Sequence, residues 1–247
     1  MVAIFILSLA LFTGATSAAD FDQYDLALNG TSNVTALHQF PSVVQVEFLD
    51  YWGWNVWTQN CAATILTSRW LLSAATCFSG PTYPSTRSRR IRAGAVYRHF
   101  GGQIVDVDFE VNYQRNVTNK TALIYDMSVV RLRSPLFYSN LVSQGAIIAS
   151  GFQIPTGLVV NQNSSELTIA PVTIGVRLYP SNGTHPTILV GHPSVGEVSG
   201  DIGGPWFVGN VSIAVLSGFN TNVTWTDSIY ATSISSFTNW IVSIAST

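Results

Sequence analysis

The chain has 247 residues, a length that fits one all-β domain of barrel or sandwich type, or at most two small domains. Its formal net charge of −2 provides no field that would attract nucleic acid or an anionic membrane. Only 10% of its residues are charged, against about 25% in an average globular protein, so its solubility needs another source.

Residues 1–19 predict a secretory signal peptide. Residues 2–12 form an apolar run that is too short to cross a bilayer comfortably, and the small residues Ser17 and Ala19 suit signal peptidase. A buried N-terminal helix is the alternative interpretation. No later apolar run has transmembrane length, so we expect residues 20–247 to form a soluble, secreted, extracellular protein.

Short apolar segments separated by turn signals follow a polar arm at residues 20–39 and predict β-strands. A helical period is convincing only near the end, where Phe237, Trp240 and Ile241 share one face and Ser235 is the predicted N-cap. Many short strands and one terminal helix predict a two-barrel or sandwich architecture. The strand candidates are 43–48, a hairpin at 51–57, 61–66, 70–75, 91–94, 104–111, 123–132, 146–149, 158–160, 172–178, 187–190, 206–208 and 211–216.

The two cysteines, Cys61 and Cys77, predict a disulfide in an oxidising compartment. The bridge would close a loop of about 15 residues and contribute roughly 3 kcal/mol. Two thiols cannot build a zinc site, and the four histidines have no ligand spacing. We therefore expect neither a metal nor another cofactor.

Eight Asn-Xaa-Ser/Thr sequons predict a glycoprotein, because glycans would place hydrated bulk on the loops of a weakly charged protein. The alternative is that some sequons arise by chance where Asn, Ser and Thr are abundant in turns. The sequons begin at Asn29, Asn33, Asn116, Asn119, Asn163, Asn182, Asn210 and Asn222.

Two side-chain clusters each have a structural and a functional interpretation. A basic cluster is either a solvated edge between a loop and a strand or an anionic docking site. It consists of Arg87, Arg89, Arg90 and Arg92. A tryptophan cluster either covers the barrel beside the first cysteine or forms an exposed recognition patch. It consists of Trp52, Trp54 and Trp57.

Several stretches occur in the order of one known family. Residues 61–66 and 69–77 read Cys-Ala-Ala-Thr-Ile-Leu and Arg-Trp-Leu-Leu-Ser-Ala-Ala-Thr-Cys, and residues 126–132 read Asp-Met-Ser-Val-Val-Arg-Leu. Residues 200–205 read Gly-Asp-Ile-Gly-Gly-Pro, and residues 230–241 end in Phe-Thr-Asn-Trp-Ile. These motifs resemble the chymotrypsin-like serine proteases, especially the secreted insect trypsin-like branch, over about residues 26–245. The resemblance implies two six-stranded antiparallel Greek-key β-barrels with a short C-terminal helix.

The resemblance also assigns the catalytic histidine, aspartate and serine to the positions of Thr76, Asp126 and Ile202. In that mechanism the histidine accepts the serine proton, the aspartate orients the histidine, and backbone amides stabilise the oxyanion. Threonine is no base near neutral pH and isoleucine has no oxygen, so only Asp126 matches. We expect no functional catalytic residue, although the amides of Gly200 and Ile202 can still form the oxyanion loop.

Three further departures agree with this expectation. No Lys or Arg precedes Arg69, so no tryptic cleavage would free a terminus to pair with Asp201. We expect Asp201 to be protonated, to find another partner, or to be exposed in a zymogen-like loop. Val198 and Ser199 replace a cysteine of the second barrel. The specificity pocket is degenerate because a glycine replaces its acidic residue. The pocket residues are Gly196, Ser217, Gly218 and Phe219.

These features predict a secreted serine protease homologue without catalysis, a pseudoprotease that acts by binding. It would be a protease cofactor, a decoy for protease inhibitors, or a binder of peptide or protein in the degenerate cleft. The alternative is a serine-type endopeptidase or hydrolase with residual or unconventional catalysis. Ser199 lies too far from position 202 to replace the nucleophile. We expect a protein or peptide partner, no nucleic acid, no membrane association and a monomer.

Overall fold

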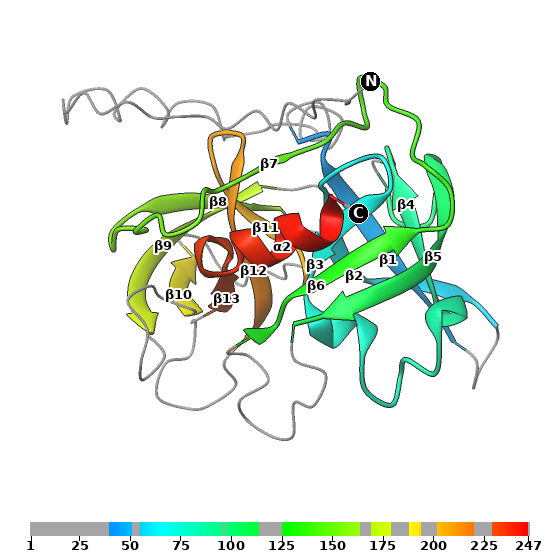
Figure 1. The fold of residues 1–247 in the computed structure, drawn as a ribbon, viewed down its shortest axis with the longest axis horizontal. Coiled ribbons are helices and arrows are strands. Elements are labelled where there is room, and N and C mark those ends of the chain that lie inside the picture. Colours follow the sequence, from blue (N-terminus) through cyan, green and yellow to red (C-terminus); the bar gives the residue numbers. More distant parts are fainter. Residues whose placement is uncertain are drawn as a thin grey trace.

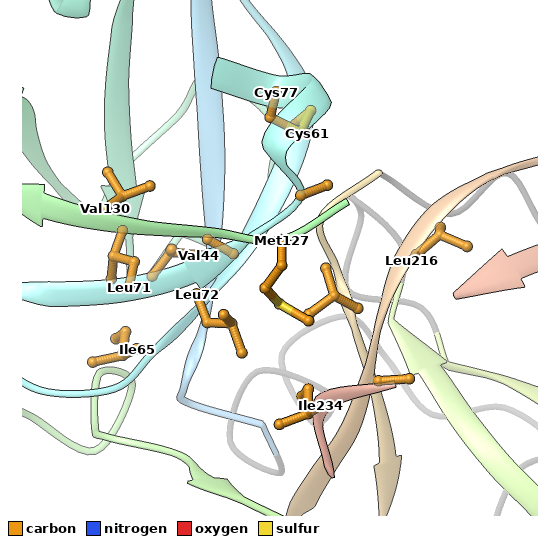
Figure 2. Packing of buried hydrophobic residues seen from close by; sticks show 14 of the residues in the cluster. Val44, Cys61, Ile65, Leu71, Leu72, Cys77, Met127, Val130, Leu216 and Ile234 are labelled. Atoms are coloured by element: carbon orange, nitrogen blue, oxygen red, sulfur yellow. A yellow bond between two sulfur atoms is a disulfide. The ribbon is translucent and has the colours of Figure 1, made fainter. Parts of the chain in front are cut away.

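The computed structural model describes residues 40–50, 55–95, 97–113, 125–163, 169–178, 188–193, 202–219 and 229–246. These residues form two β-barrels that lie side by side, the first coloured blue to green and the second yellow to red (Figure 1). One apolar core continues from the first barrel into the second, and Figure 2 shows part of it, from Ile65 and Leu72 through Met127 to Leu216 and Ile234.

The first barrel is a closed ring of six antiparallel strands in the order β1-β2-β3-β6-β5-β4. Its strands are the apolar segments of the first half of the chain, and side chains such as Val46, Ile65 and Ile91 are 0% exposed. The ring closes where β4 pairs with β1. The bounds are β1 Val43–Leu49, β2 Trp57–Ile65, β3 Trp70–Ser73, β4 Arg89–Ala93, β5 Gln103–Asn112 and β6 Ser128–Leu132.

The second barrel is also a ring of six antiparallel strands, in the order β11-β8-β9-β10-β13-β12, which the pairing of β11 with β12 closes. The predicted pair of six-stranded barrels is thus confirmed. A short strand that the resemblance did not imply, β7 (Ala146–Ile147), joins β12 in parallel. The bounds are β8 Val159–Asn163, β9 Ile169–Leu178, β10 Ile188–Pro193, β11 Pro205–Val208, β12 Val211–Phe219 and β13 Ile229–Ser233.

The C-terminal helix α2 (Thr238–Ala245) packs against the first barrel through aromatic rings. The Tyr113 ring lies 4.7 Å from Phe237 and 5.1 Å from Trp240, in edge-to-face geometry. The predicted N-cap is wrong, because Phe237 precedes the helix and Ser235 lies in the 3₁₀ turn η5 (Ile234–Ser236). None of the helices in the described ranges is long and apolar enough to cross a membrane.

Three predicted strands are shorter than expected. The one predicted at 146–149 is β7, and in the other two 3₁₀ turns or irregular chain replace the lost ends. The strand predicted at 70–75 ends at Ser73, and the turn η2 (Ala75–Phe78) follows. The strand predicted at 123–132 begins at Ser128. A second 3₁₀ turn, η3 (Thr86–Ser88), leads into β4. The shortened ends of β3 and β6 lie next to the positions that the resemblance assigns to catalysis, where the chain leaves the barrel.

The basic cluster is largely buried, so both of its interpretations are wrong for Arg89 and Arg92. Arg89 is 1% exposed and its guanidinium lies 3.3 Å from the Phe48 ring centre. Arg92 is 6% exposed and pairs with the fully buried carboxylate of Glu47 at 2.6 Å. Arg90 binds the other oxygen of Glu47 at 2.5 Å. The Glu47 carboxylate therefore already neutralises the Arg90 and Arg92 charges that an anionic partner would have to bind.

Glu47 is the counter-charge of two arginines of this cluster, Arg90 and Arg92. Burial alone would raise the pKa of its carboxyl, but hydrogen bonds from Arg92 and Arg90, together with their charges, keep the pKa below its ordinary value. The Arg90 guanidinium also lies 4.3 Å from the ring centre of Trp57, which is half-buried. Trp57 thus covers the barrel, while Trp52 and Trp54 lie outside the described residues.

Replacing Glu47 with Gln should lower the free energy of unfolding by about 3–5 kcal/mol, because it leaves two guanidinium groups without their buried counter-charge. Urea unfolding at neutral pH, followed by tryptophan fluorescence, measures this loss. Asp108→Asn is the matched control, since its pair with Arg131 at 3.5 Å is about 40% exposed. The control should cost at most about 1 kcal/mol. Equal losses in both variants would contradict the assignment.

Candidate functional site

The three positions that the resemblance assigns to catalysis come from three separate parts of the fold. Thr76 lies in the turn η2, Asp126 lies just before β6, and Ile202 lies just before β11. The Thr76 amide donates to Asp126 Oδ1 at 2.7 Å, and the Thr76 hydroxyl donates to Oδ2 at 3.0 Å. Thr76 is exposed while Asp126 is 1% exposed, so the threonine lies between the carboxyl and solvent.

The Asp126 carboxyl is almost completely shielded from solvent. Burial raises its pKa from 3.8 to about 6, although hydrogen bonds from Thr76, the Ala75 amide and the Ser217 hydroxyl oppose the rise. The Ser217 side chain is also 2.7 Å from the Thr232 hydroxyl. The second barrel therefore contributes to a site whose other groups come from the first barrel.

The loop that carries Ile202 is bound to the first barrel through its backbone. The Ala62 amide donates to the Ile202 carbonyl at 2.9 Å, and Ile202 forms an isolated parallel bridge with Cys61. Cys61 and Cys77 form a disulfide, as predicted (Figure 2). The Ile202 side chain is half-buried and packs against the core, so apolar carbon fills the position of the family's nucleophile.

Gly203 fixes the direction of this loop. Its φ is +87°, and its amide donates to the Leu216 carbonyl at 2.7 Å. A Cβ at this position would collide with Ser73 Oγ and the Ala62 carbonyl, which are themselves hydrogen-bonded at 2.7 Å. Only glycine fits here, because both the φ and the space exclude a side chain. The sequence analysis did not single out Ser73 or Gly203, although both lie inside the quoted motifs.

The expected pocket residues are only partly described. Ser217 and Gly218 are buried in β12, and Gly218 pairs with Tyr230 of β13. The backbone of Phe219 pairs with Ile229. Sequence reasoning placed Ser217 in the pocket but missed its hydroxyl contact with Thr232 and its effect on the pKa of Asp126. Three residues with predicted roles, Gly196, Gly200 and Asp201, lie outside the described residues, as do most sequon asparagines.

The chemistry of the described site follows from these contacts. Of the three assigned positions, only Asp126 has a side chain that ionises near neutral pH. Thr76 has an ordinary hydroxyl, and the Ile202 side chain contains only carbon and hydrogen. An unactivated alcohol next to a carboxyl with no imidazole between them lacks the proton relay of acyl transfer. Among the residues that the structure describes, no group of three or more His, Cys, Asp or Glu is placed to hold a metal ion.

Asp126→Asn should change how stability depends on pH. Because the folded-state pKa of about 6 exceeds the ordinary 3.8, the carboxyl favours folding below pH 3.8 and loses this contribution as pH rises through 6. The asparagine keeps an oxygen for the Thr76 amide but does not titrate. The stability of the native chain relative to the variant should therefore fall by about 3 kcal/mol between about pH 3.5 and pH 7. Urea unfolding at both pH values measures it, and a pH-independent difference would contradict it.

Gly203→Ala should destabilise the fold more than an alanine at a glycine with open surroundings. Gly157 is the matched control, because its φ is +79° and nothing lies within 4 Å of a Cβ there. Gly157→Ala should cost about 1–2 kcal/mol for the backbone alone. Gly203→Ala should cost about 1–3 kcal/mol more, from the collisions with Ser73 and Ala62. Thermal unfolding of the two variants compares them, and equal costs would argue against the close packing.

Known proteins are similar to this chain over most of its length. A family model described as Trypsin matches residues 30–241. The alkaline trypsin A of Manduca sexta is 26% identical over 237 residues, which cover 87% of this chain and 88% of the relative. Trypsin beta of Drosophila erecta is 27% identical over 210 residues, which cover 76% of this chain and 79% of the relative.

Solved structures share the fold. The scabies mite inactivated protease paralogue S-I1 matches with a TM-score of 0.66 at 19% identity, over 85% of this chain and 96% of that one. A mutant of human heparin binding protein matches with a TM-score of 0.63 at 15% identity, over 85% of this chain and 93% of that one. With two barrels, a disulfide beside the Ile202 loop and a family match across 30–241, this chain belongs to the trypsin family.

Proposed function

We propose that this chain is a secreted, non-catalytic member of the trypsin family that acts by binding another protein or a peptide. The observation that carries the proposal is the pair formed by Thr76 and Asp126. The amide and the hydroxyl of Thr76 both donate to the carboxyl, at the position where the family mechanism needs a base. The carboxyl is thus engaged by the residue that replaces the histidine.

The catalytic histidine and serine of the family react directly with the substrate, so we expect their replacement to abolish the reaction. In a protease with the same catalytic triad, removing the serine or the histidine lowers kcat by about a million-fold. Here both positions are changed, since Thr76 is no base and Ile202 has no nucleophilic atom. Replacing one group with a neighbour would need a nucleophile within about 3 Å of a base. The contacts described around Asp126 contain hydroxyl and amide donors only.

The preserved packing around Ile202 supports binding as the remaining role. The Ala62–Ile202 hydrogen bond, the glycine at position 203 and the Ser73–Ala62 contact keep the loop in a defined conformation. Exposed Thr76 lies at the surface of the same region. An exposed region of this kind is suited to binding a protease inhibitor, a peptide, or an active protease that the chain assists. Secretion is supported by the signal-like residues 1–19 and by the disulfide.

The structural relatives help to define the proposal. The mite protein is described as an inactivated protease paralogue, so a chain of this fold can persist without protease activity. The human protein is described as binding heparin, a polyanion. A similar activity is disfavoured here, because the chain has a formal net charge of −2 and Glu47 engages Arg90 and Arg92.

The second candidate function is endopeptidase activity, and the relatives named trypsin favour it. It would require catalytic groups outside the three assigned positions. The two candidates differ in a single property, which is whether the folded chain contains an activated nucleophile. A covalent probe therefore separates them more directly than a panel of substrates.

The secreted, folded chain should not react with a fluorophosphonate or with a peptide chloromethyl ketone, because positions 76 and 202 offer neither base nor nucleophile. Mass spectrometry of the intact protein measures the labelling, with an active trypsin as the positive control and heat-denatured chain as the background. One equivalent of label on a residue of the cleft would overturn the non-catalytic proposal.

The double variant Thr76→His with Ile202→Ser tests how much besides these two residues is missing. We expect hydrolysis of an Arg or Lys peptide substrate to stay near the background, because Gly196 leaves the pocket without a carboxylate and no tryptic site precedes Arg69. Circular dichroism and binding of a substrate-like inhibitor verify that the variant folds. Trypsin-like turnover would show that the two substitutions alone account for the inactivity.

Capture of partners from the native secretion then distinguishes a protease inhibitor from an active protease as the bound partner.

A further inference from the structure

We propose that Asn210 carries an N-linked glycan and that the glycan is added before the second barrel closes. The proposal rests on secretion, which is part of the proposed function, but not on the absence of catalysis. The reaction is a glycosyl transfer from a lipid-linked oligosaccharide diphosphate. The side-chain amide nitrogen of Asn210 forms a bond to the anomeric carbon, the carbon–oxygen bond to the diphosphate breaks, and the amide loses one proton.

Asn210 lies at the tip of a two-residue turn that joins β11 to β12. Val208 pairs with Val211 across the turn, and Gly209 has a φ of +56°. A positive φ at the first central position is the requirement of a type II′ hairpin turn, which glycine satisfies. Asn210 itself is exposed and lies at the rim of a surface pocket of about 230 Å³. Asn210 is exposed at a turn tip, so a glycan attached to it can extend into solvent.

Ser212, the hydroxyl residue of this sequon, is placed in the opposite way. It is 0% exposed in β12, and its hydroxyl has no hydrogen-bond partner in the part of the chain that the structure describes. An unpaired buried hydroxyl costs about 1–3 kcal/mol. Two other buried hydroxyls are also unpaired, Thr64 and Ser128, but neither follows an exposed asparagine by two residues.

A requirement of the glycosylation reaction, which acts before folding, explains why a serine with an unpaired hydroxyl is buried at position 212. The acceptor motif needs a hydroxyl two residues after the asparagine. In the folded barrel the Ser212 hydroxyl is buried. An enzyme that must contact this hydroxyl can therefore reach it only while the chain is unfolded. Ser212 is thus retained for a reaction of the nascent chain, at a cost to the folded one.

The central experiment expresses the full chain in a eukaryotic secretory cell line and maps glycans by peptide mass spectrometry after enzymatic release in water enriched in oxygen-18. Asn210 should be occupied. Asn210→Gln and Ser212→Ala should each remove one glycan, whereas Ser212→Thr should keep it. Asn60→Gln is the matched control, because Asn60 is exposed in β2 and begins no sequon. An unoccupied Asn210, or a chain that stays inside the cell without glycans, would overturn the proposal.

The order of events has its own test. Purified oligosaccharyltransferase with a lipid-linked donor should glycosylate a synthetic peptide spanning residues 206–216 but not Asn210 of the folded, unglycosylated chain. Equal modification of both would contradict addition before folding. After enzymatic deglycosylation of both proteins, Ser212→Ala should melt no lower than the native chain, because it loses only an unpaired hydroxyl. A lower melting temperature would show that Ser212 supports the fold and would remove the reason for the inference.

Discussion

The two barrels meet at the site through a shared apolar core and through a backbone hydrogen bond from the Ala62 amide to the Ile202 carbonyl. The bond joins the loop before β11 of the second barrel to strand β2 of the first barrel, and the Cys61–Cys77 disulfide holds β2 to the turn that carries Thr76. The hydrogen bond and the disulfide involve only backbone and sulfur atoms. The junction is therefore indifferent to which side chains stand at the two positions of catalysis.

This indifference explains how the fold accommodates Thr76 and Ile202 at these two positions. A histidine and a serine contribute little to the packing of a barrel, whereas Gly203 has no substitute because its φ and its neighbours exclude a Cβ. Ile202 even adds apolar contact with the core at the place of a polar side chain. The packing of this junction therefore constrains the glycine and the strand partners more than the residues at positions 76 and 202.

The strands and the disulfide were predictable because alternating apolar segments and a cysteine pair are local signals with few other interpretations. The basic cluster was not, because the sequence places Glu47 about forty residues before Arg90 and Arg92, and only the pairing of β1 with β4 brings them together. A run of arginines that seemed solvated became buried for this reason. The N-cap prediction failed for a local reason, since the Ser235 hydroxyl pairs with Ser233 and the helix begins only at Thr238.

Within the site, sequence reasoning identified Asp126 through its motif but had no means to see why it remains. The structure offers a reason that does not involve catalysis. The Thr76 amide and hydroxyl donate to this carboxyl, and the Ala75 amide and the Ser217 hydroxyl lie close enough to lower its pKa. Removing the acceptor would leave the two Thr76 donors without this partner. An aspartate at this position therefore reports the polar network of the fold, and its presence is no sign of a proton relay.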